Sequence, residues 1–153
     1  MALYLVQHGQ SLPKDVDPDQ GLSENGIAET KRIADVARGY QVNVSLIKQS
    51  GKKRARQTAE ILADALKPAG GVEAVSGLKP LDDVAAMAVS LDAAADTMLV
   101  GHLPFMSRLT SLLVTGSADR PIFQFQNSGI LCLDRDPDTG SWLIVWALMP
   151  KIG

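Results

Sequence analysis

Short apolar runs recur along the chain, and each ends at a glycine or a polar residue. The clearest cover residues 2–7 and 97–101, and shorter ones cover about 43–48 and 72–75. Runs of this length with such ends are typical of buried strands. The pattern therefore predicts four strands in the first two thirds of the chain.

Between these runs the apolar residues recur at helical spacing. The segment from about 52 to 66 is the clearest, because its apolar positions follow i, i+4, i+7, i+8 and i+11. An earlier helix is expected to start near Ser23, which favours the N-cap position, and to run to about Arg38, with Gly39 as its stop. Two further helices are predicted to open at Asp82 or Asp83 and near Pro104.

The last part of the chain changes character. Two strand-like runs, at 128–133 and 142–148, flank the turn sequence at 136–140 and indicate an antiparallel hairpin. Alternating strands and helices followed by a hairpin predict an α/β fold. We expect a three-layer sandwich with a mostly parallel central sheet, an antiparallel C-terminal edge hairpin, and a single domain over residues 1–153.

The chain contains two histidines, and each one closes an apolar run. His8 follows the first strand and His102 follows the fourth. In open α/β sheets the ligand crevice lies beyond the carboxyl ends of the strands. The strand near 43–48 leads to the same edge and is followed by the basic segment at 52–56. Two imidazoles and a basic loop at one edge suit an anion, above all a phosphoryl group.

Composition narrows the functional classes. The chain has 153 residues, of which 46% are hydrophobic and 21% charged, and its net charge is −2. This balance is typical of a globular domain and argues against a general nucleic-acid binder. The basic segment is therefore interpreted as a local site. No apolar run approaches the roughly 20 residues that span a bilayer, and no signal peptide is visible.

The single cysteine, Cys132, lies within the apolar run that precedes the hairpin turn. We interpret it as a small buried hydrophobic residue. One cysteine allows no intrachain disulfide, which fits a reducing compartment. Together with the missing signal peptide, this predicts a cytoplasmic location.

His8 and His102 suit complementary tasks in phosphoryl transfer. An imidazole nitrogen of His8 could attack phosphorus if the other ring nitrogen donates to a fixed acceptor, and Gly9 would let the backbone approach the phosphate. His102 could donate to a phosphoryl oxygen beside the helix that starts near Pro104. Taken alone, a histidine at a strand end is more often structural. No spacing typical of a zinc site occurs, so no metal is predicted.

Arg54 is the third candidate. The cations around it lie at a helix N-terminus, where the helix dipole disfavours each by about 0.3–1 kcal/mol. A bound phosphate would offset this cost, and a guanidinium binds phosphate through two charge-assisted hydrogen bonds. The alternative is a solvated helix face.

Four short motifs carry a family resemblance when taken in order. They are Val6-Gln7-His8-Gly9, Leu22-Ser23-Glu24-Asn25-Gly26, Ser50-Gly51-Lys52-Lys53-Arg54-Ala55-Arg56-Gln57-Thr58 and Gly101-His102-Leu103-Pro104. On these residues the chain resembles the histidine phosphatase superfamily, and most closely its short phosphohistidine phosphatases of the SixA type. With the final strand pair that ends in Pro150, the resemblance spans nearly the whole chain.

The resemblance implies a cofactor-free phosphatase with His8 as nucleophile and with Arg54 and His102 in the phosphate pocket. In the superfamily a carboxylic acid after the third strand protonates the leaving group, and Asp83 is the candidate here. The alternative role for Asp83 is a helix cap. The implied substrate is a phosphorylated protein, above all a phosphohistidine, or a small phosphomonoester. Neither nucleic acid nor membrane is an expected partner.

One residue departs from the family pattern. Gln7 stands where the family has arginine, so this phosphate-binding position keeps N–H donors and loses its charge. Three nearby lysines could supply a charge instead: Lys14, Lys52 and Lys53. The main alternative to a phosphatase is therefore a phospho-ligand binding module without turnover. A phosphoglycerate-type mutase is least favoured, because nothing resembles its substrate-enclosing segments.

Overall fold

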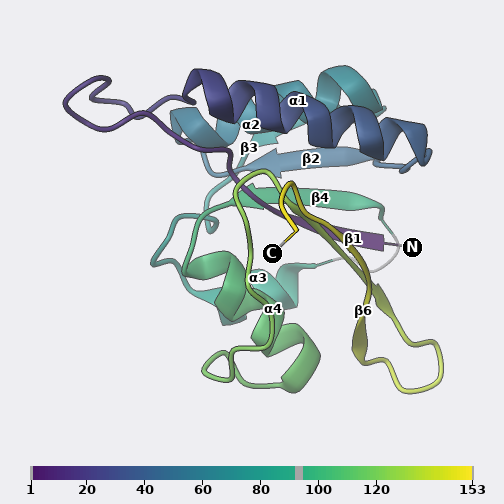
Figure 1. The fold of residues 1–153 in the computed structure, drawn as a ribbon. Coiled ribbons are helices and arrows are strands. Elements are labelled where there is room, and N and C mark those ends of the chain that lie inside the picture. The colour runs from purple at the N-terminus through teal and green to yellow at the C-terminus, as the bar shows by residue number, and fades with distance from the viewer. Residues whose placement is uncertain (1, 92–94, 153) are drawn as a thin grey trace.

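Strands and helices alternate through most of the chain, as the hydrophobic pattern predicts (Figure 1). A computed structural model describes residues 2–91 and 95–152. Its elements are β1 (Ala2–Gln7), α1 (Glu24–Gly39), β2 (Leu46–Gln49), α2 (Lys53–Leu66), β3 (Val72–Ala74), α3 (Val84–Ser90), β4 (Thr97–Gly101), α4 (Phe105–Thr115), β5 (Ile130–Arg135) and β6 (Trp142–Leu148).

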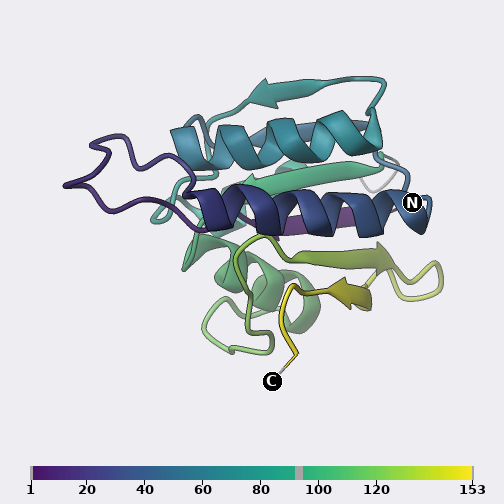
Figure 2. The same ribbon diagram turned by 45° about the horizontal axis from the view of Figure 1, so that its top comes forward.

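The strands form one sheet in the order β3-β2-β4-β1-β5-β6. The first four strands of the chain are parallel to one another, whereas β5 runs antiparallel to β1 and β6 antiparallel to β5. The expected α/β fold with a C-terminal edge hairpin is thus confirmed. Because β1, β2 and β4 are parallel neighbours, their carboxyl ends meet at one edge of the sheet. The loop between β1 and α1 extends beyond that edge (Figures 1 and 2).

Helices cover both faces of the sheet. In Figure 1, α1 and α2 lie on one side of the strands, and α3 and α4 lie on the other. Two separate clusters of buried apolar residues fill the spaces between these layers. The structure therefore has the predicted three layers. None of its described helices is long and apolar enough to cross a membrane.

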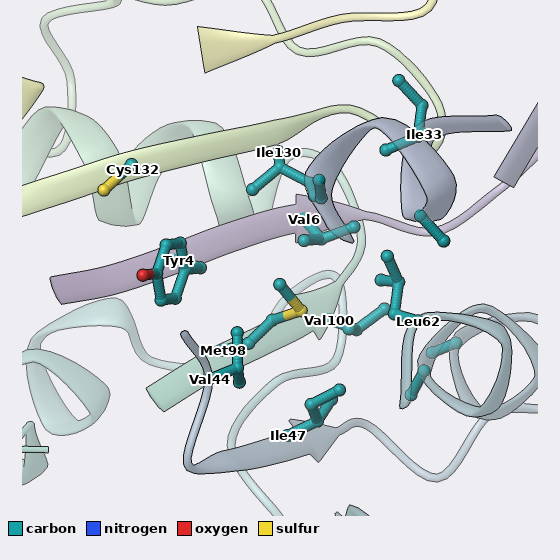
Figure 3. Packing of buried hydrophobic residues seen from close by; sticks show 14 residues of the cluster. Tyr4, Val6, Ile33, Val44, Ile47, Leu62, Met98, Val100, Ile130 and Cys132 are labelled. Carbon is teal, nitrogen blue, oxygen red and sulfur yellow. The ribbon is translucent and has the colours of Figure 1, made fainter. Parts of the chain in front are cut away.

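Alternating side chains of β1 and β4 supply both clusters. Tyr4 and Val6 of β1 and Met98 and Val100 of β4 pack under α1 and α2 (Figure 3). Their sequence neighbours face the opposite way, under α3 and α4: Leu3, Leu5 and Leu99. Strands buried on both faces are typical of parallel sheets, which explains why these segments read as unbroken apolar runs.

Most helix boundaries follow the predicted signals. Ser23 caps α1, its hydroxyl accepting from the Gly26 N–H at 3.0 Å, although Gly39 is the last residue of the helix and Tyr40 is its C-cap. On α2 the predicted apolar positions Ala55 and Ala59 are fully buried. Cys132 is buried in β5 and is a free thiol, as expected.

Two strands begin later than the sequence indicated. The expected strand at about 43–48 starts at Leu46. The run expected at 128–133 becomes strand only at Ile130, because Ser128 has a φ of 68°, a left-handed backbone conformation outside the strand region. Buried apolar character alone did not reveal this turn of the backbone.

The packing of α2 yields a stability prediction. Leu62 is fully buried under the sheet, so Leu62→Ala should lower the free energy of unfolding by about 2–5 kcal/mol through lost contacts and a residual cavity. The matched control is Leu81→Ala at a side chain that is 89% exposed, where a change below about 0.5 kcal/mol is expected. Urea unfolding measures both, and equal losses in the two variants would contradict this account of the core.

Candidate active site

The pairing of β1 with β4 brings the two histidines together. Gln7 and Gly101, the last residues of the two strands, are register partners, and the His8 N–H donates to the Gly101 carbonyl at 3.0 Å. The centroids of the His8 and His102 rings lie 4.9 Å apart, with an interplanar angle of 51°. The two imidazoles that the sequence placed at one sheet edge are therefore in direct proximity.

His8 is held in a defined orientation. Its Nδ1 lies 2.7 Å from the Gly9 carbonyl oxygen. A carbonyl only accepts, so Nδ1 carries the ring proton and Nε2 keeps a free lone pair. The surrounding backbone is also fixed, since Asn127 donates to the His8 carbonyl and the Gly9 N–H donates to Thr58 Oγ1, both at 2.9 Å. This is the tautomer that nucleophilic attack through Nε2 requires.

Packing explains why position 9 is a glycine, and this explanation differs from the close approach to phosphate expected from the sequence. A Cβ atom at this position would lie 2.7 Å from Thr30 Oγ1 and 3.1 Å from Ser128 Oγ. Those two hydroxyls form a buried hydrogen bond of 2.7 Å with each other. The glycine is thus required by a polar pair behind the loop.

His102 is almost completely buried, with 1% of its surface exposed. Its Nε2 lies 2.6 Å from Ser50 Oγ, and the same hydroxyl oxygen accepts from the Lys52 N–H at 3.3 Å. The other ring nitrogen, Nδ1, is buried and has no hydrogen-bond partner among the described residues. Ser50 opens the motif at 50–58, but the sequence alone predicts no role for it. Its position directly after β2 was the available signal.

Burial keeps both imidazoles neutral near pH 7. Desolvation, together with the charges of His8, Arg54 and Lys52, lowers the pKa of His102 from 6.5 to about 3. Burial also lowers the pKa of His8, although its bond to Gly9 opposes the shift and the Arg54 charge adds to it. Neutral imidazoles side by side avoid the repulsion that two cations would experience.

Arg54 lies in the first turn of α2 and is partly buried. Its charge acts on both imidazoles, so the structure brings this third predicted residue to the same site.

The three lysines named above have different surroundings in the structure. Lys53 Nζ pairs with Asp17 at 3.0 Å, Lys52 acts on His102, and Lys14 is exposed on the loop before α1. Of these three lysines, Lys52 is the one whose charge acts on a histidine of the site.

Gln7 itself ends β1 and contributes a buried polar atom. Its Oε1 has no hydrogen-bond partner among the described residues. A buried unpaired oxygen costs free energy, on the order of 1–3 kcal/mol. The position before His8 thus retains a polar oxygen that is left without a partner by residues 2–91 and 95–152.

Asp83 adopts the alternative role considered for it. It is the N-cap of α3, and its carboxylate accepts from the N–H groups of Ala85 at 2.9 Å and Ala86 at 3.4 Å. It lines a hollow together with Ser50, but within residues 2–91 and 95–152 no carboxylate is hydrogen-bonded to either imidazole. The same residues contain no cluster of three or more metal-ligating side chains.

Comparison with known proteins places the chain in a family. Residues 3–82 match the histidine phosphatase superfamily (branch 1), and the chain belongs to this superfamily. Phosphohistidine phosphatase SixA of Escherichia coli (strain K12) is 26% identical over 156 residues, which cover 98% of this chain and 94% of the relative.

Solved structures agree with this assignment. The protein histidine phosphatase SixA complexed with tungstate has a TM-score of 0.85 at 26% identity, with 98% of this chain and 97% of that one covered. The putative phosphohistidine phosphatase SixA from Agrobacterium tumefaciens has a TM-score of 0.76 at 26% identity, with 97% of each chain covered. The resemblance drawn from the motifs is confirmed, and the protein is a phosphoric-group hydrolase of the histidine phosphatase class.

The buried imidazoles yield a pH prediction. The chain has two histidines, so untagged protein labelled with ¹⁵N-histidine gives two sets of imidazole signals in NMR spectra. The variant His102→Gln loses one set and thereby assigns both. Burial makes protonation harder, so His102 should stay neutral from pH 8 down to 5, and His8 should titrate below 6.5. Since unfolded histidines take up protons from about pH 6.5, the free energy of unfolding should fall below that pH. A His102 midpoint at or above 6.5 would refute the burial argument.

Proposed function

We propose that this protein hydrolyses phosphohistidine on a protein substrate through a covalent phosphohistidine at His8. The observation that carries the proposal is the 2.7 Å contact between His8 Nδ1 and the Gly9 carbonyl, which leaves Nε2 unprotonated beside His102. The SixA relatives are named as phosphohistidine phosphatases, which supports this substrate class.

The reaction proceeds in two displacements. His8 Nε2 attacks phosphorus, the bond from phosphorus to the substrate imidazole breaks, and the released nitrogen takes up a proton from solvent. A water oxygen then attacks phosphorus, the bond to His8 Nε2 breaks, and inorganic phosphate leaves while the water proton goes to solvent. Splitting the hydrolysis this way replaces one difficult step by two easier ones.

Arg54 and His102 stabilise the charge that develops on the phosphoryl oxygens. Ser50 fixes the state of His102. The Lys52 N–H already donates to the Ser50 hydroxyl oxygen, so the hydroxyl proton is available for His102 Nε2. A neutral His102 then carries its proton on Nδ1, the ring nitrogen that has no partner in the described part of the chain, and can donate it to a phosphoryl oxygen.

The engagement of Asp83 favours phosphohistidine over a phosphomonoester. An alkoxide leaving group needs a general acid, and the carboxylate proposed for that role caps α3. Imidazole leaves readily without such help. A small phosphomonoester is therefore the weaker substrate class.

Gln7 is the observation that favours a second function, a phospho-ligand binding module. Charge-assisted hydrogen bonds contribute about 1.5–3 kcal/mol, against about 0.5–1.5 for neutral ones. A binding module would retain the phosphate pocket and would turn over no substrate. Turnover of a phosphohistidine peptide separates the two functions.

The covalent mechanism predicts the behaviour of His8→Ala. Wild-type protein mixed rapidly with a phosphohistidine peptide should carry acid-labile phosphate, and His8→Ala should show neither this phosphate nor turnover. Added chelator should leave the wild-type rate unchanged, since none of the proposed steps uses a metal. An unchanged melting temperature serves as the folding control for the variant. Full activity in His8→Ala would exclude the mechanism.

The charge that Gln7 lacks at this position predicts a gain of function on substitution by arginine. Gln7→Arg should add a bidentate, charge-assisted contact to phosphate and raise kcat/KM about 10- to 100-fold, equivalent to about 1–3 kcal/mol of transition-state binding. Gln7→Lys is the matched control, because it adds a charge without the guanidinium fork and should gain less. If Gln7→Arg still binds phosphate and turns over no phosphorylated substrate, the binding module becomes the better proposal.

A further inference from the structure

A strongly basic hollow of about 640 Å³ lies beside the start of α2. Two segments line it, one from the loop between β1 and α1 and one from residues 51–56. It is lined by five cationic side chains and one acidic side chain: Lys14, Lys52, Lys53, Arg54, Arg56 and Asp19. The whole chain has a net charge of −2, so this concentration of positive charge is local.

The loop that carries Lys14 is fixed in place. The Asp17 carboxylate accepts from the Gly21 N–H at 2.9 Å, from the Asp19 N–H at 3.0 Å and from Lys53 Nζ at 3.0 Å. The end of the loop is tied to α2, because the Leu22 N–H donates to Gln57 Oε1 at 2.7 Å. The loop therefore forms one built wall of the hollow.

These contacts decide which cations are available to a ligand. Lys53 is engaged by Asp17, and Arg54 belongs to the proposed phosphoryl pocket. Arg56 has only a loose contact with Glu60, 3.9 Å between two side chains that are each more than half exposed. Lys14 and Lys52 form no ion pair within the part of the chain that the structure describes. Because Lys52 also acts on His102 in the phosphoryl pocket, we call Lys14 and Arg56 the basic rim.

We propose that the basic rim recognises acidic side chains that flank the phosphorylated residue of a protein substrate. The inference rests on the proposed function and specifies its substrate. The rim continues directly from Arg54, so a phosphoryl group bound there would bring the adjoining residues of a protein over the hollow. Charge complementarity then favours aspartate and glutamate at those positions and disfavours lysine and arginine.

The test compares three substrates. Two are phosphohistidine peptides of equal length, one with glutamates and one with alanines around the phosphorylated residue, and the third is phosphoramidate, which has no flanks. At low salt the acidic peptide should have a kcat/KM about 5- to 20-fold higher than the neutral one, because each exposed ion pair contributes only a few-fold. The preference should shrink at high ionic strength, where exposed charges are screened.

Charge reversal assigns the preference to the basic rim. Lys14→Glu and Arg56→Glu should each reduce the preference for the acidic peptide several-fold, chiefly through KM, and leave phosphoramidate hydrolysis unchanged. Arg120→Glu is the matched control, since it makes the same charge change at an exposed side chain in the loop after α4. The inference is overturned if the two peptides react equally, if Arg120→Glu has the same effect, or if the rim variants slow phosphoramidate hydrolysis equally.

A binding measurement separates this inference from the proposed function. Peptides that carry a non-hydrolysable phosphotriazole in place of phosphohistidine bind without turnover. If phosphoramidate and both phosphohistidine peptides remain unhydrolysed, the proposed function fails, and the affinities of the analogue peptides still test the rim. A several-fold tighter binding of the acidic analogue supports the rim, and equal binding overturns it.

Discussion

The parallel pairing of β1 with β4 is the constraint on which the site depends. Its last rung joins Gln7 to Gly101, and the next backbone bond runs from His8 to the Gly101 carbonyl. A slip of one residue in this register would turn the side chains of one strand to the opposite face. The apolar residues on both faces resist such a slip, because it would turn the buried side chains of that strand toward the wrong core cluster. The core therefore sets the distance between the two imidazoles.

The same burial that stabilises the fold also determines the chemistry. His102 is about as buried as the apolar core residues, and this burial lowers its pKa to about 3. In a solvated position the ring would be partly cationic below pH 7 and would add a second positive charge beside that of Arg54. In this site the positive charge is held by the guanidinium, while the imidazoles remain neutral, which is the state that the proposed roles of nucleophile and donor require. Which of these groups is charged therefore follows from how deeply the imidazoles are buried.

The sequence could predict features that depend on local spacing. These include the two strands that end at the histidines, the Ser23 cap and the buried face of α2. It could not predict contacts between residues far apart in the chain. Ser50 and His102 are 52 positions apart, and Asn127 and His8 are 119 apart. Asp83 shows that local sequence can also be ambiguous, because its position before a predicted helix suits both a helix cap and a general acid. Its hydrogen bonds in the structure identify it as the cap of α3.

One hydroxyl links the two halves of the site. Thr58 Oγ1 accepts from the Gly9 N–H and donates to the Arg54 carbonyl at 2.7 Å. The loop after His8 and the first turn of α2 therefore share an anchor. A displacement of α2 that carried Arg54 away would also break the hydrogen bond of the Gly9 N–H, while the His8 backbone would keep its bonds to Gly101 and Asn127. The Thr58 hydroxyl thus couples the position of Arg54 to the loop that follows His8.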